Sequence, residues 1–593
     1  KWLWHPDGWQ ENMRCYFRME FDLEKEPTGG VLNISGDDVY SVYINGVRIH
    51  TATNFTCPPF AAEKFLRKGR NVVALDVLNI KGIGGMILRA DINTAGSSQP
   101  VEIVSDRKWR VSKEAAPGWE KTDFNDRGWR NASEIAGVTE NHIWNGLIDI
   151  KKFLSPQEFA AYRGLNEDRI EFYRKNRQKI YATLQAEPAA SKVQTVRKNG
   201  FPSIRIGDRE FPLFLYNSVM LNMDSGKGSH LDRFKRFHDA GFRLFCINVP
   251  FAEIWSADGK VNTALVEERI LNVLVAAPDA RLLLFLDLNP PRWYVERCPD
   301  ELIRYGSGAV PQFDGDHLAT PMARPSMASK RWLADCGEVI RIVLGNLEKS
   351  PVGKRIFGAL AVYGIYSEWH YFGMEKDLPD TGIAMTGRFR EFLKNKYTSD
   401  QNLRWAWGDA SVTIAAAAVP VRERLERKNC VLRAPAQEQR VLDYLECHSN
   451  VINECQKFFS AQIKKASGER ILSGHYSGYF FGMHYPAEGW QVGTPEMITG
   501  NSVDFQVAPY AYFSRDSGGT GMPRHVMDSY PLNNKFAIVE ADTRTHSSGD
   551  VHHGIAASFE ETKAQMSRDF CNAVTRGAGL WYYDFDYGWY DRP

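Results

Sequence analysis

The stretch RLLLFLDLNPPRWY (residues 281–294) decides the fold. Its first half is a short, almost continuous apolar run that ends in polar residues and two prolines. A run of this length, bounded by turn residues, is typical of a strand buried on both faces of a parallel sheet. Similar runs occur on either side of it along the chain, with helical patterns between them. We expect these further strands at residues 212–216, 243–249, 358–365, 470–476, 502–508, 535–540 and 579–584.

Strands that alternate with helices in this way are the signature of a parallel barrel. Together with the run at 281–288 they make a set of eight, which predicts an α/β fold with a (β/α)₈ TIM barrel over residues 210–593. The long segments after the third and fourth strands fit elaborated loops over an active site.

The segment before the barrel has a different pattern. Residues 1–140 contain short alternating or β-branched runs separated by turn signals such as Asn45-Gly46, which predict a jelly-roll β-sandwich. Residues 141–209 contain a charged stretch of helical period over 155–186 and Asn199-Gly200 between two β-like runs. We therefore expect a helical linker and a small hairpin between the sandwich and the barrel.

Composition excludes several classes of function. The 73 Lys and Arg residues balance the 72 Asp and Glu residues, so the net charge is +1, which argues against a nucleic-acid partner. No apolar run reaches the length of about 18 residues that a membrane-spanning helix needs. The nine cysteines are scattered without a CxxC pair, which leaves the compartment open. The chain starts at Lys1 without signal-peptide character, so we expect any signal peptide to have been removed.

Two glutamates stand where a barrel carries its catalytic groups, at the carboxyl ends of strands. Glu368 follows the predicted fourth strand, and Glu540 ends the seventh. Glycoside cleavage needs one carboxylic acid to protonate the leaving oxygen and one carboxylate to meet the positive centre that develops on the sugar. A separation of about 5–5.5 Å between the two carboxyl groups would mean retention of configuration. Two glutamates at one end of a barrel could supply these two groups.

Other polar and aromatic residues near the predicted strand ends are candidates for binding the sugar. Aromatic rings stack on the C–H faces of sugars, while amides and charged groups bind the hydroxyls. The candidates are Asn217, Asn248, Asn289, Trp293, Trp369, His475, Tyr510, Arg544, Asp584 and Trp589. We expect no cofactor and no metal, since no compact set of oxygen ligands accompanies Asp584 and Asp586.

The two glutamates on strands four and seven resemble clan A of the glycoside hydrolases, in which the first is the acid/base and the second the nucleophile. The order of sandwich and barrel, with aromatic residues on strand eight, resembles the family 42 β-galactosidases, and residues 1–140 resemble a galactose-binding-like domain. The resemblance implies a retaining hydrolase of β-linked oligosaccharides or polysaccharides of β-galactoside type, with a secreted or periplasmic location. One position departs from it: Ser367 stands where the clan has an Asn that binds the sugar 2-hydroxyl.

Two alternatives stay open. A degenerate barrel that binds carbohydrate without cleaving it would tolerate Ser367. An inverting enzyme would use Asp542 or Asp584 as its base, at about 6.5–9.5 Å from the acid. The sequence leaves the sugar, the linkage and the oligomeric state, including a homo-oligomer, undecided.

Overall fold

The computed structural model describes residues 1–53, 59–80, 83–138, 144, 148, 150–218, 229–308, 323–364, 367–369, 378–426, 433–476, 494–524, 526–547, 556–584 and 589–590. Contacts divide the chain into two compact units. The first consists of Lys1–Ile170, Arg544–Phe559 and Asp586–Pro593, and the second of Glu171–Thr543 and Glu560–Phe585. Two short segments that the sequence analysis grouped with the barrel, 544–559 and 586–593, thus belong to the first unit.

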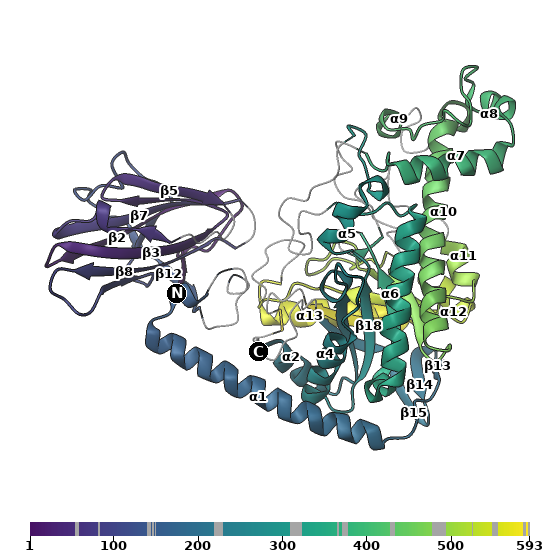
Figure 1. Cartoon of the computed structure of the whole chain (residues 1–593), viewed down its shortest axis with the longest axis horizontal. Coiled ribbons are helices and arrows are strands. Elements are labelled where there is room, and N and C mark those ends of the chain that lie inside the picture. The colour runs from purple at the N-terminus through teal and green to yellow at the C-terminus, as the bar shows by residue number, and fades with distance from the viewer. Residues whose placement is uncertain are drawn as a thin grey trace. The chain divides into compact units, whose positions relative to one another are not determined.

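The first unit is built on two antiparallel sheets, which confirms the predicted sandwich (Figure 1). One sheet has the order β12-β1-β8-β3-β6, with β9 paired to β8. Its strands are β1 (Trp2–Trp4), β3 (Pro27–Asp37), β6 (Phe60–Ala61), β8 (Gly85–Thr94), β9 (Val101–Val104) and β12 (Ser133–Ala136). The other has the order β11-β10-β2-β7-β4-β5. Its strands are β2 (Met13–Leu23), β4 (Val39–Ile44), β5 (Val47–Thr53), β7 (Gly69–Asn79), β10 (Arg110–Ser112) and β11 (Arg130–Asn131).

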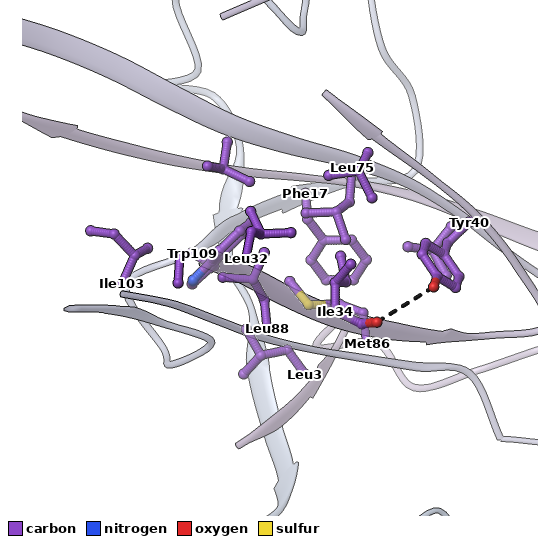
Figure 2. Packing of buried hydrophobic residues seen from close by; sticks show 14 of the residues in the cluster. Leu3, Phe17, Leu32, Ile34, Tyr40, Leu75, Met86, Leu88, Ile103 and Trp109 are labelled. Carbon is purple, nitrogen blue, oxygen red and sulfur yellow. Dashed lines mark hydrogen bonds between the residues drawn. The ribbon is translucent and has the colours of Figure 1, made fainter. Parts of the chain in front are cut away.

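The two sheets enclose one hydrophobic core, shown in Figure 2. Strand β4 illustrates why, because its Tyr40, Val42 and Ile44 are buried while the residues between them are partly exposed. Alternate side chains of a strand point to opposite faces, so one face of β4 joins the core and the other meets solvent. Leu75 on β7 and Leu88 on β8 come from opposite sheets and lie in the same buried cluster.

Helix α1 (Pro156–Ala186) follows the sandwich. Its start is a capping box, in which the Ser155 hydroxyl accepts from the Glu158 backbone N–H at 3.2 Å and the Glu158 carboxylate accepts from the Ser155 N–H at 2.8 Å. The strands β13 (Val193–Lys198), β14 (Phe201–Ile206) and β15 (Arg209–Pro212) then form a small antiparallel sheet. Asn199 and Gly200 both have positive φ angles, 51° and 82°, as a two-residue hairpin turn requires.

The second unit contains a closed barrel of eight parallel strands in chain order, which confirms the predicted fold class. Each strand begins and ends within three residues of its predicted bounds. The strands are β16 (Phe214–Ser218), β17 (Leu244–Pro250), β18 (Arg281–Asp287), β19 (Ile356–Val362), β20 (Leu472–Tyr476), β21 (Phe505–Pro509), β22 (Phe536–Ala541) and β23 (Gly579–Asp584). Almost every residue of these strands is buried, which explains why their sequences are continuously apolar.

Helices connect the barrel strands (Figure 1). They are α2 (Ser229–Asp239), α3 (Phe251–Ile254), α4 (Thr263–Ala276), α5 (Arg292–Arg297), α6 (Lys330–Lys349), α7 (Ile383–Tyr397), α8 (Asp400–Trp407), α9 (Arg422–Leu425), α10 (Pro435–Ala466), α11 (Thr494–Thr499), α12 (Ser529–Leu532) and α13 (Phe559–Thr575). Helices α7, α8 and α9 form an insertion that packs against α10. Within the part of the chain that the structure describes, every helix is too short or too polar to cross a membrane.

The sandwich core gives a direct test of the packing. Replacing Leu75 by Ala (L75A) removes a fully buried side chain from the middle of β7. We expect a loss of about 2–5 kcal/mol of unfolding free energy in the transition of the first unit, because a buried Leu→Ala change leaves a cavity. Urea unfolding followed by tryptophan fluorescence measures it. The control V47A changes a residue that is 50% exposed on β5 and should cost less than about 1 kcal/mol; equal losses in the two variants would contradict the assigned core.

Candidate active site

One hydrogen bond identifies the inner face of the barrel. The hydroxyl of Tyr476, at the end of β20, donates to the carboxylate of Glu540 on β22. Strand β21 lies between β20 and β22 in the sheet, so this bond crosses the interior and both side chains point inward. Residues paired side by side share a face of the sheet, and so do residues two apart in one strand. The strand register therefore adds further residues whose side chains point into the barrel: Asn217, Cys246, Asn248, Asp287, Trp581 and Tyr583.

Glu368 is held by a tight backbone turn after β19. The residues on either side of it, Ser367 and Trp369, have left-handed backbone angles with φ of 67° and 60°. Such angles are uncommon outside glycine and concentrate at functional sites. The Trp369 N–H donates to the Tyr363 carbonyl at 2.8 Å, which closes the turn. The backbone thus fixes the position of Glu368 after the fourth strand, and its role as the acid stays a prediction.

Trp369 anchors this turn. The residue is fully buried, its indole N–H donates to the Ala361 carbonyl at 3.2 Å, and its ring lies 5.9 Å from that of Tyr363 and 6.1 Å from that of Phe459. A ring enclosed in this way cannot stack on a sugar. Trp369 therefore supports Glu368 through packing and is not the sugar-binding platform expected from the sequence.

Burial dominates the electrostatics of the two glutamates. The exposed fractions of Glu368 and Glu540 are only 4% and 3%. Burial raises the pKa of Glu368 well above its ordinary value, and the negative charge of Glu540 raises it further. Burial also raises the pKa of Glu540 to about 8, with a further contribution from the charge of Asp542, while the hydrogen bond from Tyr476 and the charge of Arg515 oppose the shift.

The two carboxyl groups interact strongly enough to titrate as a pair. Two carboxylates in one buried space resist losing both protons, because the second charge meets the first without water between them. The hydrogen bonds from Tyr476 and Trp581 favour the charged form of Glu540, so we expect the pair to lose its first proton from Glu540. The singly protonated pair then consists of a neutral Glu368 and a charged Glu540.

Two of the proposed sugar-binding asparagines share the inner face with this pair. Asn217 on β16 is paired with Tyr583, and Asn248 on β17 is paired with Phe285, whose ring lies 6.1 Å from that of Tyr476. The side chain of Asn289 instead forms hydrogen bonds to other residues of the protein. Its amide donates to Asp287 at 2.7 Å and to the Gly364 carbonyl at 3.3 Å, and its oxygen accepts from Arg324 at 2.7 Å.

His475 and Asp584 lie on the other face of their strands. Each is adjacent in the chain to an inward residue, Tyr476 or Tyr583, so each points toward the helices. Burial lowers the pKa of His475 to about 3, which keeps the ring neutral. Asp584 accepts from the Tyr216 hydroxyl at 3.4 Å and lies 3.5 Å from the guanidinium of Arg233, and both the aspartate and the arginine are buried. This placement gives Asp584 a structural ion pair.

Tyr510 and Trp293 also have contacts within the protein. The Tyr510 hydroxyl donates to the backbone carbonyl of Asp569 on α13. The half-buried Trp293 lies on α5, where its indole donates to the Trp255 carbonyl at 3.0 Å and its ring meets the Trp255 ring edge-on at 5.0 Å. We conclude that Tyr510 stabilises the wall of the barrel and that Trp293 is half-buried beside Trp255.

Arg544 and Trp589 belong to the first unit. The guanidinium of Arg544 lies 4.7 Å above the ring of Trp589. The sequence analysis proposed both as sugar-binding residues, and that role stays a prediction. Asp586, which was considered with Asp584 as a cation site, lies outside the described residues. Among the residues that the structure describes, no group of three or more His, Cys, Asp or Glu side chains could hold a metal ion.

Sequence reasoning missed two buried arginines beside the glutamates. Arg515 and Arg524 lie between β21 and β22, in a segment whose glycines and serines indicated only a loop. Their exposed fractions are 5% and 2%, and the charges of both lower the pKa of Glu368. The guanidinium groups lie 4.1 Å and 4.7 Å from the ring centre of Tyr512. The sequence carried little sign of this role, because the pairing of Arg515 with Asp542 is visible only in the structure.

Comparison with known proteins gives partial similarity. No protein-family model matches the chain. An α-L-rhamnosidase of Streptomyces avermitilis is 28% identical over 196 residues, which span 31% of this chain and only 18% of that protein. The β-galactosidase from the psychrophilic Marinomonas ef1 aligns with 63% of this chain and 54% of its own, at 15% identity and a TM-score of 0.44. The catalytic domain of a β-amylase from Paenibacillus polymyxa aligns with 63% of this chain and 92% of its own, at 12% identity and a TM-score of 0.45.

The buried glutamates predict an unusual pH dependence of stability. A carboxyl group whose pKa is raised on folding stabilises fully below its unfolded pKa, and this contribution is lost as the pH rises through the folded value. For Glu540 the window runs from 4.5 to about 8. We expect the variant E540Q to be more stable than the wild type near the upper end of this window, by on the order of 1–4 kcal/mol, and to lose less stability across it.

Calorimetric unfolding at a series of pH values measures this effect. The matched control D516N neutralises an exposed carboxylate on the neighbouring loop and should leave the pH dependence as it is in the wild type. If E540Q and D516N show the same pH dependence as the wild type, Glu540 does not carry the raised pKa.

Proposed function

We propose that this protein is a retaining glycoside hydrolase that cleaves β-linked glycosides, with Glu368 as the acid/base and Glu540 as the nucleophile. The observation that carries the proposal is the pair of buried glutamates at the ends of barrel strands four and seven, of which Glu540 accepts a hydrogen bond from Tyr476 that favours its charged form. A neutral acid beside a charged carboxylate is the state that a retaining enzyme needs before it meets its substrate.

The proposed reaction has two steps. In the first, Glu368 donates its proton to the glycosidic oxygen as the bond from that oxygen to the anomeric carbon breaks, and the Glu540 carboxylate forms a bond to that carbon. In the second, the Glu368 carboxylate takes a proton from water, the water oxygen attacks the anomeric carbon, and the bond to Glu540 breaks. Two inversions at the anomeric carbon give net retention.

The placement of the two other candidate bases favours retention over inversion. An inverting enzyme needs a carboxylate that activates water. Asp542 pairs with the Arg515 guanidinium at 2.6 Å, and Asp584 points away from the barrel interior toward Arg233. Both carboxylates are engaged by buried arginines, so neither is a good base for water. Glu540 accepts hydrogen bonds from the Tyr476 hydroxyl and from the Trp581 side chain, and both favour its charged form, so it fits the nucleophile better.

In clan A an Asn at the position of Ser367 binds the sugar 2-hydroxyl. Asn248 is our candidate for this contact here. Its strand position places it on the inner face, at the same end of the barrel as the glutamates. Asn289 fits this role less well because its amide and its oxygen already bond to Asp287 and Arg324. Asn217, on the neighbouring strand, is the candidate for a second hydroxyl of the same sugar.

The first test measures glycoside cleavage by the wild type and by variants of the two glutamates. On a panel of aryl β-glycosides and oligosaccharides that includes β-galactosides and an α-L-rhamnoside, the wild type should cleave a β-linked member with retention, seen as the first product anomer by NMR. The variants E368Q and E540Q should lower kcat by at least about 10²–10⁴, since each removes a group that acts in the transition state. The control E496Q changes an exposed ion pair on α11 and should leave kcat as in the wild type.

Three results would contradict the proposal. Undiminished turnover in E540Q would exclude Glu540 as the nucleophile. An inverted first product would exclude the double displacement. Saccharide binding without cleavage of any panel member would favour the alternative function, a carbohydrate-binding protein on a degenerate barrel.

The pH profile of turnover tests the role of Tyr476. Its hydroxyl donates to Glu540 and so stabilises the charged form. The variant Y476F should move the acidic limb of the kcat/KM profile to higher pH by about 1–2 pH units, because a hydrogen bond to a charged group contributes about 1.5–3 kcal/mol. The matched control Y530F removes a buried hydroxyl that donates to the neutral Gln506 at 2.6 Å and should leave the limb in place. A shift to lower pH in Y476F would contradict the assigned hydrogen bond.

A further inference from the structure

The chain that follows Glu540 is tied to the neighbouring loop by one arginine. Asp542 lies two residues after Glu540, and its carboxylate meets the Arg515 guanidinium at 2.6 Å. Both residues are almost completely buried, with exposed fractions of 5% and 1% for Arg515 and Asp542. An ion pair so enclosed is sensitive to the loss of either partner, because the charge that remains has no water to replace the other.

Arg515 also binds backbone carbonyls on both sides of this junction. Its side chain donates to Tyr510 at 2.6 Å and to Ala511 at 2.8 Å, both directly after β21, and to the Asp542 carbonyl at 3.3 Å, directly after β22. The planar guanidinium offers five donors in a fixed arrangement, which suits a joint between several acceptors. One side chain thus connects the carboxyl ends of two adjacent barrel strands.

The charged and titratable groups around Glu540 come from several elements. Asp542 contributes a negative charge from the same segment, and Arg515 contributes a positive charge from the loop after β21. The hydroxyl of Tyr476 faces Glu540 from β20. Among the described residues, Cys246 on β17, Glu368 after β19 and Tyr583 on β23 also interact with Glu540 electrostatically.

A second buried arginine, Arg524, lies beside the same tyrosine ring as Arg515. The Tyr512 ring lies 4.1 Å from the Arg515 guanidinium and 4.7 Å from that of Arg524. A ring next to two cations attracts both through its negative face. The charge of Arg524 affects Glu368 more strongly than that of Arg515 does. Arg515 instead forms the ion pair with Asp542, two residues after Glu540.

We infer that Arg515 is a positioning residue of the glutamate pair: it fixes the segment that carries Glu540 and neutralises Asp542, so that Glu540 is the glutamate that holds the negative charge. The catalytic consequence of this inference rests on the proposed function. Without Arg515, the Asp542 carboxylate would lie unneutralised near Glu540 and oppose its ionisation. Glu540 would then keep its proton to higher pH, so the nucleophile would be charged only at higher pH.

Three variants of the full chain separate charge from structure. R515M removes the positive charge, D542N removes the negative charge, and R515M/D542N removes both. The expected result is that the pH dependence of unfolding assigned to Glu540 moves up by about 1 pH unit in R515M, moves down in D542N, and returns toward the wild type in the double variant. The acidic limb of kcat/KM should follow the same order. R515K retains the charge without the planar fork, so it should shift less than R515M while it lowers kcat.

Arg470 provides a matched control at the other end of the barrel. It pairs with Glu348 at 2.5 Å and donates to the Ile356 carbonyl at 3.0 Å and the Gly353 carbonyl at 2.9 Å. R470M removes an arginine with the same kinds of partners, so it should lower stability without moving either pH midpoint.

The unfolding measurement needs no turnover, so the inference and the proposed function can fail separately. The ordered shifts in unfolding support the inference even when no glycoside is cleaved, in which case only the proposed function fails. A shift in R515M no larger than in R470M, or a double variant that stays as far from the wild type as R515M, overturns the inference. If R515M does not fold, D542N alone decides: the inference predicts a downward shift, and an unchanged or upward shift contradicts it.

Discussion

The mutual repulsion of two carboxyl groups enclosed in one barrel mouth is the interaction on which the site depends. Glu368 and Glu540 are both almost completely buried, and each raises the energetic cost of charging the pair. Such an arrangement lowers stability at neutral pH, and proteins retain it where chemistry requires one carboxyl group to stay neutral beside a charged one. The surrounding groups determine which of the two keeps the proton. Tyr476 and Arg515 favour the charged form of Glu540, and Asp542 opposes it.

The barrel brings these groups together through the register of its strands. Tyr476, Glu540 and Tyr583 reach one space from three different strands, and the left-handed turn around Ser367 and Trp369 brings Glu368 to the same end. Parallel strands in a closed barrel have their carboxyl ends at the same end of the barrel, so side chains at these ends lie close together. Arg515 connects the segments that follow β21 and β22.

The barrel strands and the positions of both glutamates at strand ends were predictable from the sequence, and the contacts around the glutamates were not. Continuous apolar runs such as 281–288 identify buried parallel strands, and a polar residue directly after such a run lies at the correct end of the barrel. The face to which that residue points is harder to predict. His475 and Tyr476 are adjacent, yet only Tyr476 points inward, because an offset of one residue reverses the face. Trp369 was misread as a platform because its burial follows from the backbone turn, which leaves no mark in the sequence. The role of Arg515 was not predicted because its ion-pair partner, Asp542, lies after the next strand, 27 residues along the chain.

The most direct test of the account is the protonation state of the glutamate pair itself. Infrared difference spectra between the wild type and E368Q, recorded from acidic to alkaline pH, follow the absorption of the protonated carboxyl group that the variant lacks. The account predicts that this band persists in the wild type through neutral pH and disappears only at pH values well above the ordinary range for a glutamate. A band that disappears with an ordinary glutamate pKa, of about 4.3, would show that the two carboxyl groups are not coupled in a dry site and would contradict the central claim.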